Sequence, residues 1–151
     1  AKKMKINHFA LSFTNSKNDI SKFNKLLANK ERIFKIETQS AINNLNQIIS
    51  AGKNFLIDRG DLSKEISIEM IPIIQRKILK IAKEKKRKVY VATNFLESMI
   101  KNHYPTRAEV NDIYNTLELG ATGLVLAAET AIGKFPEECV NLLRRVYKTF
   151  R

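Results

Sequence analysis

Apolar positions change their spacing repeatedly along the chain, and these changes predict alternating strands and helices. Short runs rich in β-branched and aromatic residues are separated by segments in which apolar residues recur three or four positions apart. The short runs predict five strands, near His8–Phe13, Arg32–Glu37, Asn54–Ile57, Val89–Ala92 and Gly123–Leu126. This alternation is typical of an α/β fold, in which helices cover a sheet of parallel strands.

Three of the intervening segments place apolar side chains on one helical face, which we expect to pack on the sheet. The positions that share a face are Ile20, Phe23, Leu26 and Leu27, then Ile42, Leu45, Ile48 and Ile49, and later Val110, Ile113, Tyr114 and Leu117.

Local signals at helix ends support the same elements. Thr106 and Glu109 have the spacing of a capping box, and Gly120 is placed to end the helix that follows. Pro136 suits the first position of a further helix.

The length of the chain limits the architecture. Its 151 residues predict a single domain over 1–151. A closed eight-stranded α/β barrel needs about 250 residues, so the five strand–helix units are expected to form only part of such a barrel.

Charge raises the question of a polyanionic partner. The formal net charge is +12, and basic residues are dense in the segment Arg76–Lys88. The same segment directs Ile78, Ile81 and Ala82 to one side, which is typical of a helix with a solvated basic face. Because aromatic residues and recognised nucleic-acid motifs are missing from it, nucleic acid is not the expected partner.

Cysteine usage and hydropathy bear on the cellular setting. Cys139 is the single cysteine, so an internal disulfide is excluded, and no paired Cys/His spacing suggests zinc. No stretch is long and apolar enough for a membrane span, and residues 1–5 lack the apolar run of a secretion signal. We therefore expect a cytoplasmic protein with no membrane partner.

Charged residues at predicted strand ends are the candidate chemistry. Lys35 and Glu37 are two residues apart on one strand, so their side chains point to the same side. Arg59, Gly60 and Asp61 follow the next strand and add a second carboxylate. Two carboxylates suit Mg²⁺ or Mn²⁺. The alternatives are an ion pair without a ligand for Lys35 and Glu37, and a surface turn for residues 59–61.

Five short runs, in this order and spacing, resemble the catalytic barrel of pyruvate kinase. They are Lys35-Ile36-Glu37, Asp58-Arg59-Gly60-Asp61, Val91-Ala92-Thr93-Asn94, Pro105-Thr106-Arg107-Ala108-Glu109 and Ala127-Ala128-Glu129-Thr130. The resemblance begins near Phe9 and covers most of the chain, and residues 94–109 are its most specific part. It implies a partial TIM barrel, with the first three strands, the lid domain and the allosteric domain of the family absent from this sequence.

The resemblance also assigns roles to particular residues. Glu37 and Asp61 match the ligands of a divalent cation, Mg²⁺ or Mn²⁺. The amides around Arg59, Gly60 and Asp61, together with Thr93, match the site that binds the carboxylate of phosphoenolpyruvate. Lys35 matches the lysine that stabilises the transferred phosphoryl group and the enolate, and Thr93 is expected to relay a proton through water.

Two further matches concern support of the site. Ser12, with Phe13, matches a serine–phenylalanine pair near the family's active site, although we expect a buried serine that caps a strand end. Glu129, with Thr130, matches a strand-end motif that lies behind the active site in the family and helps to order its loops. The potassium ligands of the family belong to strands absent here, so the K⁺ site is expected to be lost.

The sequence also departs from the family at positions near the chemistry. Asp58 stands where alanine is usual, Asn94 replaces a glutamine, and Ala127 and Ala128 replace serine and glycine. The extra charge of Asp58 is expected to crowd the anion site or to add a metal ligand.

Two functional hypotheses remain open from the sequence. The first is a domain that binds Mg²⁺ with phosphoenolpyruvate or pyruvate, related to glycolytic phosphoryl transfer but inactive alone because the nucleotide-binding half is absent. The second is a degenerate interaction or regulatory module that binds polyanions.

The exposed edges of an incomplete barrel require cover. We expect self-association into a homo-oligomer. The alternatives are a separate second chain that completes the barrel and an opening of the barrel into a doubly wound sheet.

Overall fold

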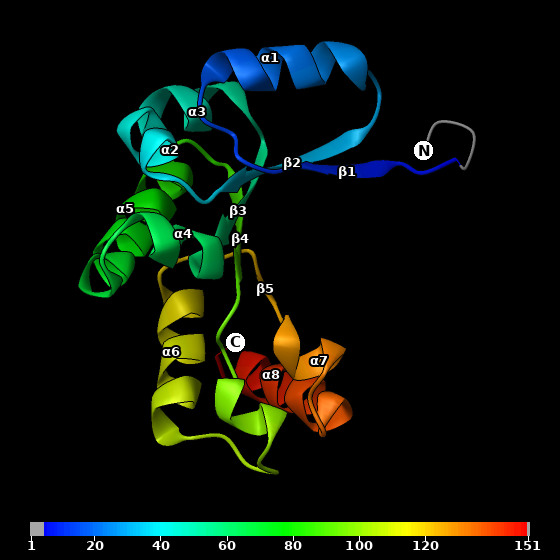
Figure 1. Ribbon diagram of the computed structural model, residues 1–151, viewed down its shortest axis with the longest axis vertical. Coiled ribbons are helices and arrows are strands. Elements are labelled where there is room, and N and C mark those ends of the chain that lie inside the picture. Colours follow the sequence, from blue (N-terminus) through cyan, green and yellow to red (C-terminus); the bar gives the residue numbers. More distant parts are fainter. Residues whose placement is uncertain (1–4, 151) are drawn as a thin grey trace.

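The fold is built on one five-stranded parallel sheet in which the strands follow chain order, β1-β2-β3-β4-β5. A computed structural model describes residues 5–150 (Figure 1). The strands are β1 (His8–Leu11), β2 (Glu31–Ile36), β3 (Asn54–Asp58), β4 (Lys88–Ala92) and β5 (Gly123–Val125). All five predicted strands are confirmed. Phe13, Glu37 and Leu126 lie just beyond strand ends rather than within them.

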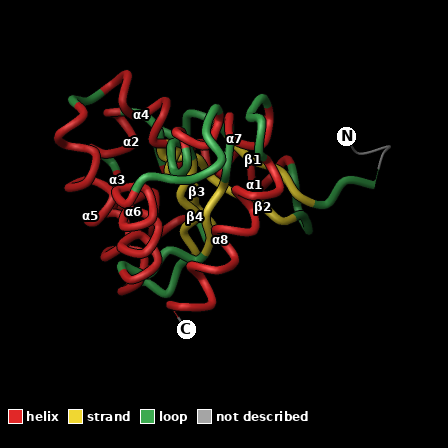
Figure 2. Tube along the Cα trace, turned by 90° about the horizontal axis from the view of Figure 1, so that it is seen from below, coloured by secondary structure: helices red, strands yellow, loops and turns green. Residues whose placement is uncertain are grey.

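Helices occupy the connections between the strands. They are α1 (Lys17–Leu26), α2 (Gln39–Asn43), α3 (Leu45–Ala51), α4 (Arg59–Glu65), α5 (Ile71–Glu84), α6 (Arg107–Glu118), α7 (Ala128–Ala131) and α8 (Pro136–Phe150). Two 3₁₀ turns, η2 (Ile68–Met70) and η3 (Glu97–Ile100), lie before α5 and before α6. Figure 2 shows the strands gathered centrally with helices around them.

Alternation along the central strands separates two faces of the sheet. Phe34 and Ile36 of β2 and Phe55 and Ile57 of β3 are buried and belong to the main apolar core, together with residues of α3 and α5. Lys35 lies on the opposite face, opposite Leu56 in the β2–β3 register, and is only partly buried. The helix-covered face therefore supplies the core, whereas the other face carries a charged group.

The strand order identifies the sheet as a barrel segment. A doubly wound sheet changes direction at a switch point, whereas the strands described here follow one another without a reversal. The α/β partial-barrel prediction is confirmed, and the doubly wound alternative is not what the sheet shows. β1 and β5 are its edge strands.

Local signals predicted from sequence are present at helix ends. Thr106 and Glu109 form the predicted capping box at the start of α6. Gly120 follows that helix with a φ of 99°, a left-handed conformation that glycine adopts readily. Pro136 begins α8.

Each of the three predicted apolar faces needs a correction. Leu26 is 64% exposed, because α1 ends at this residue and the chain turns away towards β2. The residues from Ile42 to Ile49 do not form one helix, because α2 ends at Asn43 and α3 begins at Leu45. Tyr114 is also exposed, although its ring packs edge-on against Phe150 at 5.6 Å between centroids.

The prediction that no segment spans a membrane can be compared with the helices of the structure. Among residues 5–150, no helix combines the length and apolar character needed to cross a bilayer. The expectation of no secretion signal concerns residues 1–5, of which 1–4 lie outside the described residues. Cys139 is fully buried within the core cluster, as a small apolar residue would be.

Candidate functional site

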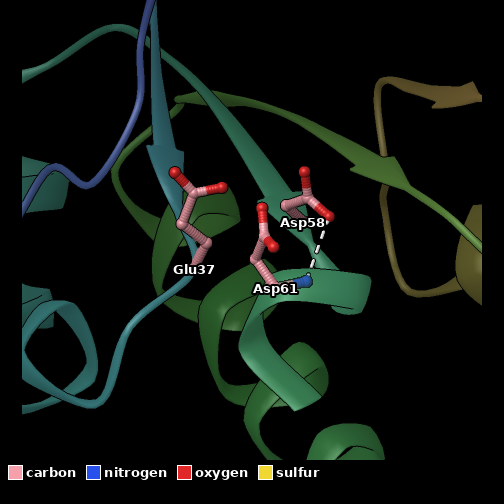
Figure 3. Close-up of side chains that lie close together, drawn as sticks. All are labelled: Glu37, Asp58 and Asp61. Carbon is pink, nitrogen blue, oxygen red and sulfur yellow. Dashed lines mark hydrogen bonds between the residues drawn. The ribbon is translucent and has the colours of Figure 1, made fainter. Parts of the chain in front are cut away.

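Three carboxylates converge where β2 and β3 end. Glu37 directly follows β2, Asp58 is the last residue of β3, and Asp61 lies in the first turn of α4. Each offers an oxygen, and these oxygens lie within 4.8 Å of one another (Figure 3). The convergence arises because the carboxyl ends of parallel strands meet at one edge of the sheet.

Lys35 places a positively charged ammonium group within this cluster. Its Nζ lies 2.8 Å from Oε2 of Glu37 and 2.9 Å from Oδ2 of Asp58. Burial is the largest single effect on the pKa of Lys35 and lowers it, but hydrogen bonds and charges from Glu37 and Asp58 outweigh burial, so the pKa is raised. Lys35 is therefore a fixed positive charge at neutral pH.

Glu37 is the most buried member of the cluster, with 1% of its surface exposed. Its Oε1 accepts a hydrogen bond of 2.7 Å from the Phe13 amide. Its Oε2 has the ion pair with Lys35 but no hydrogen bond from any other group among the described residues. A buried carboxylate oxygen with spare acceptor capacity is a suitable ligand for a hard cation.

Asp61 lies at the rim of the same cluster. Lys64, one turn later on α4, lies 2.8 Å from its Oδ1. The hydrogen bond from Lys64 is the main reason that the pKa of Asp61 is held below its ordinary value. The Asp61 carboxylate is thus ionised and reachable from solvent.

Asp58 contacts two other residues of the cluster. Oδ2 meets Lys35, and Oδ1 accepts a long hydrogen bond of 3.4 Å from the Asp61 amide, so Asp58 is also the N-cap of α4. The sequence identified Asp58 as a departure from the family that would crowd the anion site or add a metal ligand, but not as a partner of Lys35. Strand alternation was the available signal, since Asp58 shares a face with Leu56, which is opposite Lys35.

Gly60 and Thr93 join α4 to the end of β4. The Gly60 amide donates a hydrogen bond of 2.8 Å to Oγ1 of Thr93, which in turn donates to the carbonyl of Ala92. Thr93 adopts a φ of 74°, which is unusual for a β-branched residue. Both Gly60 and Thr93 therefore lie beside the cluster, but their polar groups are engaged with each other.

The Arg59 side chain turns away from the carboxylates. It donates two hydrogen bonds to the Thr93 carbonyl, at 3.0 and 2.6 Å, and pairs with Asp112 of α6 at 2.7 Å. Its guanidinium also stacks over Phe95, 4.1 Å from the ring centroid. These contacts fasten α4 to the loop after β4 and to α6.

The two supporting residues predicted from the family occupy different settings. Ser12 lies just beyond β1, next to Phe13, and it is exposed, so the expectation of a buried serine at the strand end is wrong. Glu129 is 1% exposed and accepts hydrogen bonds from three backbone amides. These come from Phe95 and Leu96 at 3.1 Å and from Ala127 at 2.8 Å.

An open pocket lies beside the first turn of α4. Its volume is about 420 Å³, and its lining includes Gly60, Ser63 and Asn94 together with the apolar residues Ile68, Ile71 and Pro72. The carboxylates do not line it directly. The pocket therefore adjoins the cluster through Gly60, the neighbour of Asp61.

Comparison with known proteins gives a consistent family. A family model described as the pyruvate kinase barrel domain matches residues 1–140. Pyruvate kinase of Thermotoga maritima is 44% identical over 95% of this chain and 32% of its own length. Pyruvate kinase of Methanocaldococcus jannaschii is 40% identical over 93% of this chain and 32% of its own length.

A plant relative extends the same result. Plastidial pyruvate kinase 2 of Arabidopsis thaliana is 39% identical over 94% of this chain and 25% of its own length. The chain thus spans about a third or less of the curated relatives it matches. The chain forms a parallel barrel segment with these strand-end motifs, and the family model matches it over residues 1–140. The chain therefore belongs to the pyruvate kinase barrel-domain family.

Proposed function

We propose that the domain binds a divalent cation, Mg²⁺ or Mn²⁺, together with phosphoenolpyruvate or a pyruvate-like acid. The observation that carries this proposal is the convergence of Lys35, Glu37 and Asp61 at one sheet edge. The donor set fits such a cation, because it consists of carboxylate oxygens and one of them, Oε2 of Glu37, is buried with spare acceptor capacity.

Each residue has a defined task in this proposal. Glu37 and Asp61 hold the cation, and Lys35 places a positive charge where an enolate oxygen gains negative charge. The cation, when bound, acts as a Lewis acid towards the keto oxygen. Lys35 suits its task because its raised pKa keeps it protonated.

Substrate binding at Gly60, Asp61 and Thr93 requires an exchange of partners. The Gly60 amide bonds Thr93 and the Asp61 amide bonds Asp58, so a substrate carboxylate must replace these internal acceptors. Rotation of the Thr93 hydroxyl away from Ala92 would also free it to pass a proton through water. The Arg59 side chain would contribute by holding Thr93 in position.

Phosphoryl transfer by this chain alone is not part of the proposal. Such transfer depends on positioning and charge neutralisation around the whole phosphoryl group, and the family's K⁺ site is not expected here. We propose that the edges of β1 and β5 are covered in a homo-oligomer or by a second chain, in a cytoplasmic setting.

Calorimetric titration of the chain with Mn²⁺ and then with oxalate, a mimic of the enolate, tests the proposal. Wild type is expected to bind Mn²⁺ and then oxalate, and Asp61→Ala is expected to lose both heats. Glu69→Ala is a matched control, because Glu69 is an exposed acid of η2 outside the cluster. Absence of binding by wild type at millimolar ligand would overturn the proposal.

A second candidate function is polyanion binding. Three lysines are exposed between the end of α5 and the start of β4: Lys85, Lys86 and Lys88. The carboxylates lie at the other end of the strands, where β2 and β3 finish. A steep salt dependence of polyphosphate binding that disappears on charge reversal at Lys85 and Lys86 would support it. Unchanged binding after that reversal would count against it.

A further inference from the structure

Asp58 distinguishes this cluster from a site with only two acids. Its side chain is 15% exposed and engages both carboxylate oxygens, one with Lys35 and one with the Asp61 amide. We propose that Asp58 is the specificity-determining residue of this site, favouring a divalent cation and disfavouring phosphorylated acids as the anionic ligand. This inference rests on the proposed function, because it concerns the same site.

The charge balance gives the first argument. Three acids, Glu37, Asp58 and Asp61, are paired with two lysines, Lys35 between the first two and Lys64 on Asp61, which leaves the cluster with a formal charge of −1. A neutral residue at position 58 would leave it uncharged. Affinity for a hard divalent cation rises with the number of carboxylate ligands, so the third acid strengthens cation binding.

Geometry gives the second argument. The oxygen of Asp58 that caps α4 makes a hydrogen bond of 3.4 Å, which is long and weak. Exchange of this hydrogen bond for a contact between Asp58 and a cation therefore costs little free energy. The neighbouring Glu37 carboxylate belongs to the same cluster, and its buried Oε2 has Lys35 as its one partner among the described residues.

The state of Lys35 gives the third argument. Its Nζ is paired with Glu37 at 2.8 Å and with Asp58 at 2.9 Å. A phosphate or carboxylate that approaches Lys35 must displace Asp58 or remain beside it, and like charges at such distances repel strongly where solvent is partly excluded. The ligand class that suits the site is therefore a divalent cation chelated by a monocarboxylate such as pyruvate, rather than by a phosphorylated acid.

Asp58→Asn is the most informative variant. Asparagine is as good an N-cap as aspartate, so α4 should stay intact, and thermal unfolding in EDTA checks this. We expect Asp58→Asn to weaken Mn²⁺ binding by about tenfold, measured as free Mn²⁺ by electron paramagnetic resonance. With Mn²⁺ saturating, we expect the variant to bind phosphoenolpyruvate about tenfold more tightly and pyruvate with little change.

The outcomes separate this inference from the proposed function. Mn²⁺ affinity that survives Asp58→Asn but falls in Asp61→Ala overturns the role of Asp58 and leaves the metal site standing. Weaker Mn²⁺ binding without a gain for phosphoenolpyruvate overturns the selectivity. A wild-type chain that binds no Mn²⁺ overturns both.

Discussion

Two glutamates of this domain are equally buried, each 1% exposed, but their surroundings differ. Glu129, after β5, accepts hydrogen bonds from the amides of Phe95, Leu96 and Ala127. Glu37, after β2, has the Phe13 amide on one oxygen and the Lys35 ammonium near the other.

The difference shows how to separate structural acids from candidate ligands. Backbone amides cannot move away from Glu129 without distorting the loops that they belong to, so its charge holds the loop after β4 against the end of β5. Lys35 is a flexible side chain, so its contact with Glu37 can be exchanged without movement of the backbone. We therefore infer that burial with a displaceable side-chain partner marks a candidate ligand, whereas burial alone does not.

The largest expected effect is on stability, at Glu129. Glu129→Ala leaves three amides without their acceptor, at about 1–3 kcal/mol for each buried group. We expect the free energy of unfolding to fall by about 3 kcal/mol or more, measured by urea denaturation. Glu129→Gln should cost less, because its carbonyl oxygen can still accept from Phe95 and Leu96. A loss under 1 kcal/mol in Glu129→Ala would contradict the structural role.

Glu37 should show the opposite pattern. Glu37→Gln can keep the hydrogen bond from Phe13, and Lys35 retains Asp58, so we expect a stability change of about 1 kcal/mol or less. Mn²⁺ affinity should fall at least about tenfold, because a charged ligand is lost. Equal losses of stability in Glu37→Gln and Glu129→Gln would erase the distinction between the two sites.

Glu109 gives a smaller effect that sharpens the same comparison. Burial is the largest single influence on its pKa and raises it, but hydrogen bonds from Ser98 and Thr106 outweigh burial and lower the pKa. The unfolded chain therefore takes up this proton first as pH falls. The stability that Glu109 provides is complete above its unfolded pKa of about 4.3 and is lost as pH falls through the lower folded value.

Glu109→Gln should reduce the loss of stability that accompanies the fall in pH. The measurement is urea unfolding of wild type and variant from pH 6 to pH 3. The difference in stability should be largest at pH 6 and should shrink towards pH 3. A difference that does not depend on pH would contradict the assignment.

The sequence predicted the elements better than their packing. The alternation of short β-rich runs with helical segments located all five strands, because that signal is local. The exposure of Leu26 was not predictable from spacing, since it depends on where α1 ends. The break between α2 and α3 was missed for a related reason, because no proline or glycine marks Asn44.

For the site as well, the sequence predicted which residues come together better than it predicted their contacts. Strand-end position and family motifs placed Lys35, Glu37 and Asp61 at one edge, and the structure brings them together. Motifs could not reveal that Arg59 turns towards Thr93 and Asp112, or that Asp58 pairs with Lys35. Those contacts depend on side-chain directions between elements that are distant in sequence.

The central claim is that Glu37 and Asp61 together hold a divalent cation, and anomalous diffraction from crystals soaked in Mn²⁺ tests it most directly. The account predicts an anomalous peak between these two carboxylates, within coordination distance of an oxygen of each, with Asp58 as a third ligand. An anomalous peak elsewhere and none in this cluster would contradict the account.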